Sequence, residues 1–143
     1  MDMTGSGVTT QHMLGSNSSK GVGDFLAGAV EMREVIQVDQ HSTVNVIGIG
    51  NFTPQEKDVT HERLRALVET LSDSYDYLLI DCGDADINGL AQVADASTVV
   101  IVSATGSTEA KTLESELLRR GYPEALCLYP TESESREYIS LVA

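Results

Sequence analysis

The sequence has no tryptophan, and its five Tyr and two Phe residues keep the aromatic content at 5%. A buried core must therefore be built from Val, Ile, Leu and Ala. Basic residues are also scarce, because 9 Lys and Arg stand against 22 Asp and Glu, giving a formal net charge of -13. Such a surface repels the phosphates of nucleic acids and of anionic lipids, so we expect neither nucleic-acid binding nor direct binding to a membrane surface.

The two cysteines and the lack of a long apolar run exclude further classes of protein. Cys82 and Cys127 lie in apolar segments without CxxC spacing. That context is typical of buried thiols and argues against a zinc site or a secreted disulfide framework. No segment approaches the roughly 18 apolar residues that cross a bilayer, and the N-terminus has no secretory-signal pattern. We expect a soluble, cytoplasmic chain that reaches the inner membrane, if at all, through a partner or through missing parts.

The length of 143 residues corresponds to one domain over residues 1–143. Residues 1–20 are rich in Gly, Ser and Thr and have no sustained apolar period, which predicts a flexible loop with one helical turn. Residues 21–143 form the predicted α/β core. At its start, Asp24 is placed to cap a short helix that ends at Gly28.

Strands and helices are predicted to alternate along this core. Continuously apolar or β-branched runs predict strands at residues 44–50, 77–80, 97–102 and 125–129. Apolar residues at helical spacing predict helices at residues 30–37, 57–72, 87–93, 107–120 and 133–142. This order predicts an open, mostly parallel sheet with helices on both of its faces.

Candidate chemistry gathers at the carboxyl ends of the predicted strands, where open parallel sheets bind their ligands. Asp81, Asp84 and Asp86 follow the predicted strand 77–80 within six residues. Converging carboxylates of this kind are plausible Mg²⁺ ligands, directly or through water. In the alternative interpretation only Asp81 faces the cleft, while Asp84 turns the loop and Asp86 caps the next helix.

Signals for phosphate binding, metal binding by histidine and serine catalysis are all weak. The sequence contains no GxxxxGK(S/T) loop, in which backbone N–H groups and a lysine hold phosphates. The glycine-containing segments at residues 4–7 and 15–21 do not follow apolar strands, so we interpret both as loops. The three histidines are far apart and match no metal-binding spacing. No GxSxG elbow is present to hold a serine nucleophile.

The order of several segments resembles the cytoplasmic domain of bacterial exopolysaccharide chain-length regulators. The matching segments are residues 21–28, 30–37 and 44–50, followed by the string YDYLLID at residues 75–81. These regulators are the ExoP-like polysaccharide co-polymerases and the related bacterial tyrosine kinases (BY-kinases), within the MinD/ParA group of deviant P-loop ATPases. The resemblance covers most of residues 20–130 and implies a three-layer, P-loop NTPase-like fold.

The resemblance also implies roles for two aspartates. Asp81 matches the Walker B carboxylate near Mg²⁺, and Asp2 is similar to an aspartate of the second Walker motif, so both are candidate catalytic residues. From its position in the loop, Asp84 is a further candidate metal ligand beside Asp81. The family binds Mg²⁺ and ATP, but here no Walker A segment precedes Asp2, and Cys82-Gly83-Asp84 replaces the family's Thr-Pro-Pro. We expect this chain to bind neither and not to hydrolyse ATP.

Three functions are therefore open. The first is the cytoplasmic domain of an exopolysaccharide biosynthesis or export regulator of the ATPase/tyrosine-kinase type, inactive as given. Its partner would be a membrane-associated polysaccharide assembly protein or its own transmembrane region. The second is a degenerate, non-catalytic protein-interaction domain with the same fold. The third is a Mg²⁺-dependent phosphohydrolase that uses the aspartate cluster. A missing first strand would also leave a sheet edge unpaired, which predicts homo-oligomerisation.

Overall fold

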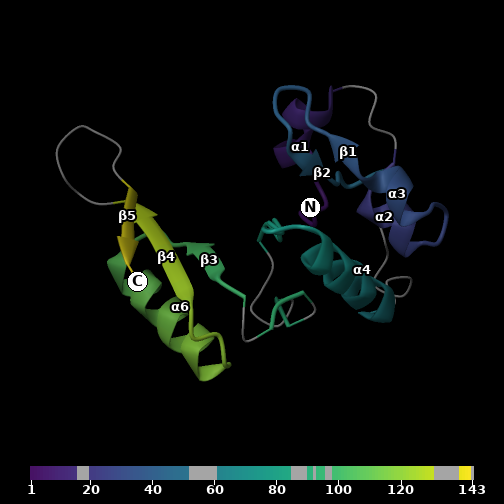
Figure 1. Ribbon diagram of the computed structural model, residues 1–143. Coiled ribbons are helices and arrows are strands. Elements are labelled where there is room, and N and C mark those ends of the chain that lie inside the picture. Colours follow the sequence, from purple (N-terminus) through teal and green to yellow (C-terminus); the bar gives the residue numbers. More distant parts are fainter. Residues whose placement is uncertain are drawn as a thin grey trace. The chain divides into compact units, whose positions relative to one another are not determined.

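The computed structural model describes residues 1–15, 20–51, 61–84, 90–91, 93–95, 98–130 and 139–142. Its contacts divide the chain into two compact units, Met1–Val93 and Ala94–Ala143. Helices and short strands occur in both units (Figure 1), so the fold belongs to the mixed α/β class, as the sequence predicts.

The first unit contains most of the described helices. They are α1 (Val8–Leu14), α2 (Val22–Leu26), α3 (Met32–Val35) and α4 (His61–Ser74). Two short strands, β1 (Gln37–Val38) and β2 (Asn45–Val46), pair antiparallel, with Gln37 opposite Val46. The predicted strand at 44–50 is therefore shorter than expected and lies in an antiparallel pair.

The core of this unit forms between α4 and the segments that precede it. Leu64, Leu67 and Leu71 lie on one face of α4 at helical spacing and are almost fully buried. They pack in one cluster with Val22, Leu26, Val35 and Ile47. The amphipathic pattern predicted for residues 57–72 is confirmed for the described part of α4, whereas residues 52–60 lie outside the described residues.

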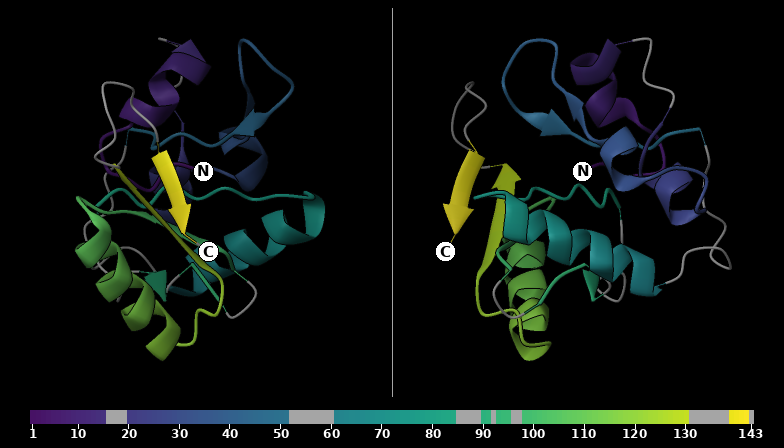
Figure 2. Two further views of the ribbon diagram at one scale, coloured as in Figure 1. Left: turned by 90° about the vertical axis from the view of Figure 1, so that its left-hand side faces the viewer. Right: turned by 45° about the vertical axis from the view of Figure 1, so that its right-hand side comes forward.

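The second unit is a β-α-β element with one added strand. It runs through β3 (Val100–Ser103), α6 (Ser107–Arg119), β4 (Ala125–Pro130) and β5 (Ile139–Val142). The strand order is β3-β4-β5, with β3 parallel to β4 and β5 antiparallel to β4. In the views of Figure 2, α6 lies beside β4, against which it packs. Ala104, Ala110 and Cys127 form its small buried cluster.

The sequence predicted the second unit well up to residue 130. The structure confirms the helix predicted at 107–120, which ends just before Gly121, a glycine with a φ of 92°. The strands predicted at 97–102 and 125–129 correspond to β3 and β4. Of the helix predicted at 87–93, most residues lie outside the described part.

Other predictions also differ from the structure. Residues 77–80 are not a regular strand, and the helix predicted at 30–37 is limited to α3, with Gln37 in β1. The helix predicted at 133–142 is wrong for its last residues, because residues 139–142 form β5. Ile and Val favour strands, and this segment pairs antiparallel with β4, with Ile139 opposite Pro130 and Val142 opposite Cys127. The sheet was predicted to be mostly parallel. Among the described strands, however, only β3 and β4 pair parallel, whereas β1–β2 and β4–β5 pair antiparallel.

Neighbouring leucines on α6 test the packing of the second unit. Leu117 is fully buried, with 0% of its surface exposed, whereas Leu118 is 62% exposed. Leu117→Ala is expected to lower the free energy of unfolding by about 2–5 kcal/mol, because it leaves a cavity. Leu118→Ala should change it by no more than about 0.5 kcal/mol. Urea unfolding followed by circular dichroism compares the two variants, and equal losses would contradict this packing.

Candidate functional site

The two aspartates identified from the sequence are neighbours in the structure. Backbone hydrogen bonds place residues 1–3 beside residues 79–81: the Met1 nitrogen donates to Leu79 O at 2.7 Å and Met3 N–H donates to Asp81 O at 2.8 Å. Asp2 and Asp81 form a parallel β-bridge. On the other side, Asp2 N–H donates to Ile47 O at 2.9 Å. Three segments distant in sequence therefore meet at Asp2.

Asp2 is a buried carboxylate, with 0% of its surface exposed. Its Oδ1 accepts hydrogen bonds from the Thr4 backbone N–H at 2.9 Å and from the Thr4 hydroxyl at 2.8 Å. Its Oδ2 accepts one from the hydroxyl of Thr10 at 2.8 Å. Both oxygens are thus satisfied within the protein, as burial of a charged carboxylate requires.

These hydrogen bonds also set the charge state of Asp2. Burial alone raises the pKa of Asp2, but the hydrogen bonds from Thr4 and Thr10 outweigh it, and the net pKa lies below the ordinary value of an aspartate. A folded-state pKa below that of the unfolded chain means that ionised Asp2 stabilises the fold. This contribution is complete above the unfolded-state pKa and is lost as pH falls through the folded-state pKa.

Asp81 is half-buried and is held in a similar way. The hydroxyl of Thr9 donates to its Oδ2 at 2.8 Å, and the backbone N–H of Gly83 donates to its Oδ1 at 3.0 Å. The adjacent Cys82 thiol has a raised pKa, because of burial first and the charge of Asp81 second. Cys82 is therefore a protonated thiol at neutral pH.

Helix α1 connects the two aspartates, because consecutive residues of this helix bind them. Thr9 donates to Asp81 and Thr10 donates to Asp2. Residues 1–20 were expected to be a flexible loop with one helical turn, but α1 spans Val8–Leu14 within it. Neither threonine is predictable from the sequence as a site residue, since a Thr-Thr pair in a Gly- and Ser-rich segment gives no helical signal.

Asp2 and Asp81, the candidate catalytic carboxylates, both accept hydrogen bonds within the protein. Asp2 is buried, and its oxygens accept three hydrogen bonds from Thr4 and Thr10 inside the protein. Asp81 accepts one hydrogen bond on each carboxylate oxygen, from Thr9 and from Gly83, and Asp84 is exposed in the following loop. Asp86 lies outside the described residues. Within the part of the chain that the structure describes, no three His, Cys, Asp or Glu side chains are grouped to hold a metal ion.

Asp24 is a second carboxylate that connects distant segments. Its Oδ2 accepts hydrogen bonds from Gly21 N–H at 2.9 Å, which caps α2, and from Asn51 N–H at 3.1 Å. Asp24 therefore caps α2, as predicted. It does so from the third residue of the helix, by accepting a hydrogen bond from the backbone of Gly21, which precedes the helix. A side chain at Gly50, whose φ is 85°, would overlap this carboxylate, so only glycine allows the close approach.

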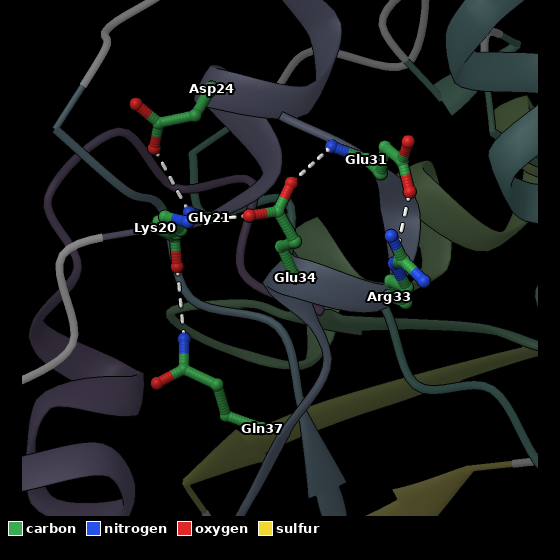
Figure 3. Close-up of polar contacts among 7 residues, drawn as sticks. All are labelled: Lys20, Gly21, Asp24, Glu31, Arg33, Glu34 and Gln37. Atoms are coloured by element: carbon green, nitrogen blue, oxygen red, sulfur yellow. Dashed lines mark hydrogen bonds and ion pairs between the residues drawn. The ribbon is translucent and has the colours of Figure 1, made fainter. Parts of the chain in front are cut away.

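A charged cluster surrounds the start of α3 (Figure 3). Lys20 pairs with Glu34 at 2.6 Å, Arg33 pairs with Glu31 at 2.9 Å, and Glu34 also caps Glu31 N–H. The hydrogen bond from Lys20 lowers the pKa of Glu34 below its ordinary value. These groups are exposed, so each pair contributes little to stability. Lys20 and Arg33, the two basic residues in Figure 3, are each paired with a glutamate, so this cluster is a network of surface ion pairs.

An open surface pocket of about 460 Å³ lies between α2, α3 and α4. Phe25, Met32 and Arg63 are among the residues that line it, and the Arg63 guanidinium stacks on the Phe25 ring at 5.0 Å from its centroid. Glu31 and Glu34 lie on its rim. None of the acidic residues predicted from the sequence lines this pocket.

Comparison of the chain with protein-family models, with curated proteins and with solved structures finds no match. In the described ranges, the helices are too short or too polar to span a membrane.

The two threonines of α1 provide a matched test of the aspartate site. Thr10→Val keeps the side-chain shape but leaves Asp2 Oδ2 buried without its donor, so it is expected to lower the free energy of unfolding by about 1–3 kcal/mol. Thr9→Val removes a donor from the half-buried Asp81, which water can replace, and should have less effect. Chemical denaturation of both variants measures the difference. A larger loss for Thr9→Val would contradict the proposed role of Asp2.

Proposed function

We propose that this chain is a non-catalytic protein-interaction domain of the exopolysaccharide biosynthesis or export machinery. It has the fold of the ATPase/tyrosine-kinase type of regulator, but it acts through contacts with a membrane-associated assembly partner and does not hydrolyse ATP. The observation that carries this proposal is the use of both candidate catalytic carboxylates, Asp2 and Asp81, as structural acceptors for the threonines of α1.

The position of the two carboxylates supports an ATPase-like origin of the fold. Asp2 and Asp81 are bridged in parallel at neighbouring segment ends, and Asp2 is also bonded to the Ile47 carbonyl. An open parallel sheet would place its ligand-binding residues at such an edge. We therefore propose the finer, three-layer P-loop NTPase-like architecture for this chain on the basis of this arrangement and of the order of segments.

The state of these carboxylates supports a loss of the chemistry. Phosphoryl transfer requires a positioned metal and charge neutralisation around the phosphates. Asp2 is buried and accepts three hydrogen bonds within the protein, and Asp81 accepts one from Thr9 and one from Gly83. A carboxylate whose lone pairs serve α1 stabilises the fold instead of a metal–nucleotide complex. This is the physical reason to favour an interaction domain over the Mg²⁺-dependent phosphohydrolase.

The charge of the chain supports an interaction with a basic protein segment. The net charge is -13, and cytoplasmic segments next to membrane spans are rich in Lys and Arg. A strongly acidic domain is attracted to such segments and accelerates their association, although the same charge repels an anionic membrane surface. The proposed partner is therefore a membrane protein with a basic cytoplasmic segment.

Calorimetry with Mg-ATP tests the absence of catalysis. The chain is expected to give no saturable heat on titration with Mg-ATP and to release no phosphate from it, because its carboxylates are already engaged. Asp81→Asn should leave this background rate of phosphate release unchanged, as should Asp76→Asn at an exposed control position.

The opposite result identifies an enzyme. Phosphate release from Mg-ATP or from a simple phosphomonoester that Asp81→Asn abolishes and Asp76→Asn preserves would overturn the proposal. Release from the phosphomonoester alone would favour the phosphohydrolase.

A further inference from the structure

Residues 77–81 have one paired edge and one open edge. Leu79 and Asp81 direct their backbone groups to residues 1–3, as the bonds from Met1 and Met3 demonstrate. In an extended chain, successive residues point their N–H and C=O groups to opposite sides. Leu78 and Ile80 therefore direct their N–H and C=O groups away from residues 1–3, and no described residue of the first unit is hydrogen-bonded to these groups.

This open edge has none of the features by which proteins protect an edge strand. Such edges usually carry Lys, Pro or a bulge, whereas residues 75–80 read Tyr-Asp-Tyr-Leu-Leu-Ile. Tyr77 and Leu79, two residues apart on one face, are 89% and 80% exposed. An apolar face beside unpaired backbone groups is suited to the addition of a strand.

The negative charge of the sequence around residues 77–81 favours a positively charged partner strand. No Lys, Arg or His lies between Arg65 and Lys111. Within the first unit, the described acidic residues of this stretch are Glu69, Asp73, Asp76, Asp81 and Asp84. A second copy of the chain would bring the same negative charge to the edge and be repelled, whereas a strand with basic ends would be attracted.

We propose that the backbone edge at Leu78 and Ile80 accepts one extended strand of a partner protein, with alternating apolar residues and Lys or Arg at its ends. This inference rests on the proposed interaction function and names its binding surface. The added strand pairs with the backbone groups of Leu78 and Ile80, its apolar side chains lie beside Tyr77 and Leu79, and its basic ends lie near Asp76 and Asp81.

Binding of a designed peptide tests this surface. The probe is a fluorescently labelled peptide of five alternating Val and Thr residues with two Lys at each end, and its matched controls carry Glu ends or a central Pro. The Lys-ended peptide is expected to bind the chain. The Pro peptide should bind about tenfold more weakly, because it cannot supply the central N–H. The Glu-ended peptide should not bind, and added salt should weaken the Lys-ended complex.

Variants of the chain locate the binding surface. Leu79→Lys should weaken binding of the Lys-ended peptide about tenfold, because it adds positive charge and removes apolar contact. Leu118→Lys makes the same change at an exposed leucine of α6 and should leave the affinity unchanged. On peptide binding, hydrogen exchange at the Leu78 and Ile80 amides should slow by at least about tenfold.

Four results would overturn the inference. The first is protection of the Leu78 and Ile80 amides in the free, monomeric chain, which would mean that the chain covers this edge itself. The second is concentration-dependent association that protects the same amides, which would identify a second copy as the occupant. The third is equal binding of the Glu-ended peptide. The fourth is binding that Leu79→Lys does not change, which would move the interaction elsewhere while leaving the interaction function intact. Phosphate release sensitive to Asp81→Asn would instead contradict the proposed function itself.

Discussion

The requirement that the buried carboxylate of Asp2 be satisfied organises the first unit. A charged group without exposure to water must find its donors inside the protein, and Asp2 finds them at Thr4 and Thr10. The donor at Thr10 fixes α1 against the bridge between Asp2 and Asp81, while the backbone of Asp2 reaches Ile47. The Asp2 side chain holds Thr4 and α1, while the backbone of residues 1–3 joins them to Ile47 and to residues 79–81.

The same arrangement decides what the acidic residues can do. Carboxylates at the ends of parallel segments are where a metal-dependent site would be expected, yet at Asp2 and Asp81 the oxygen lone pairs serve threonine hydroxyls and backbone N–H groups. Their charge then contributes to a long acidic stretch, and not to a metal centre. The open backbone edge beside them is the more accessible feature, which is why we place recognition there.

Local signals predicted much of this structure, and long-range pairing accounts for the failures. Helix α6 was predictable because its apolar period, its first-turn acid Glu109 and its terminal Gly121 all agree. Residues 139–142 were predicted as helix because nothing local marks the free edge of β4 with which they pair. Asp81 was identified as a site residue from its place after an apolar run and from a family resemblance, and Asp2 from the resemblance alone. Thr9 and Thr10 were not, since the contact of Thr9 with Asp81 spans 72 residues of sequence and no local pattern marks Thr10 as a donor to Asp2, eight residues earlier.

The most direct test of the central claim is a pH titration of the Asp2 side-chain carboxyl carbon by NMR, in the folded chain and in Thr10→Val. The hydrogen bonds predict an apparent pKa below the ordinary aspartate value of about 3.9 in the parent chain and a higher pKa in the variant. An Asp2 that titrates at or above the ordinary value, with no response to Thr10→Val, would contradict the account, because the carboxylate would then not be the buried acceptor that holds α1.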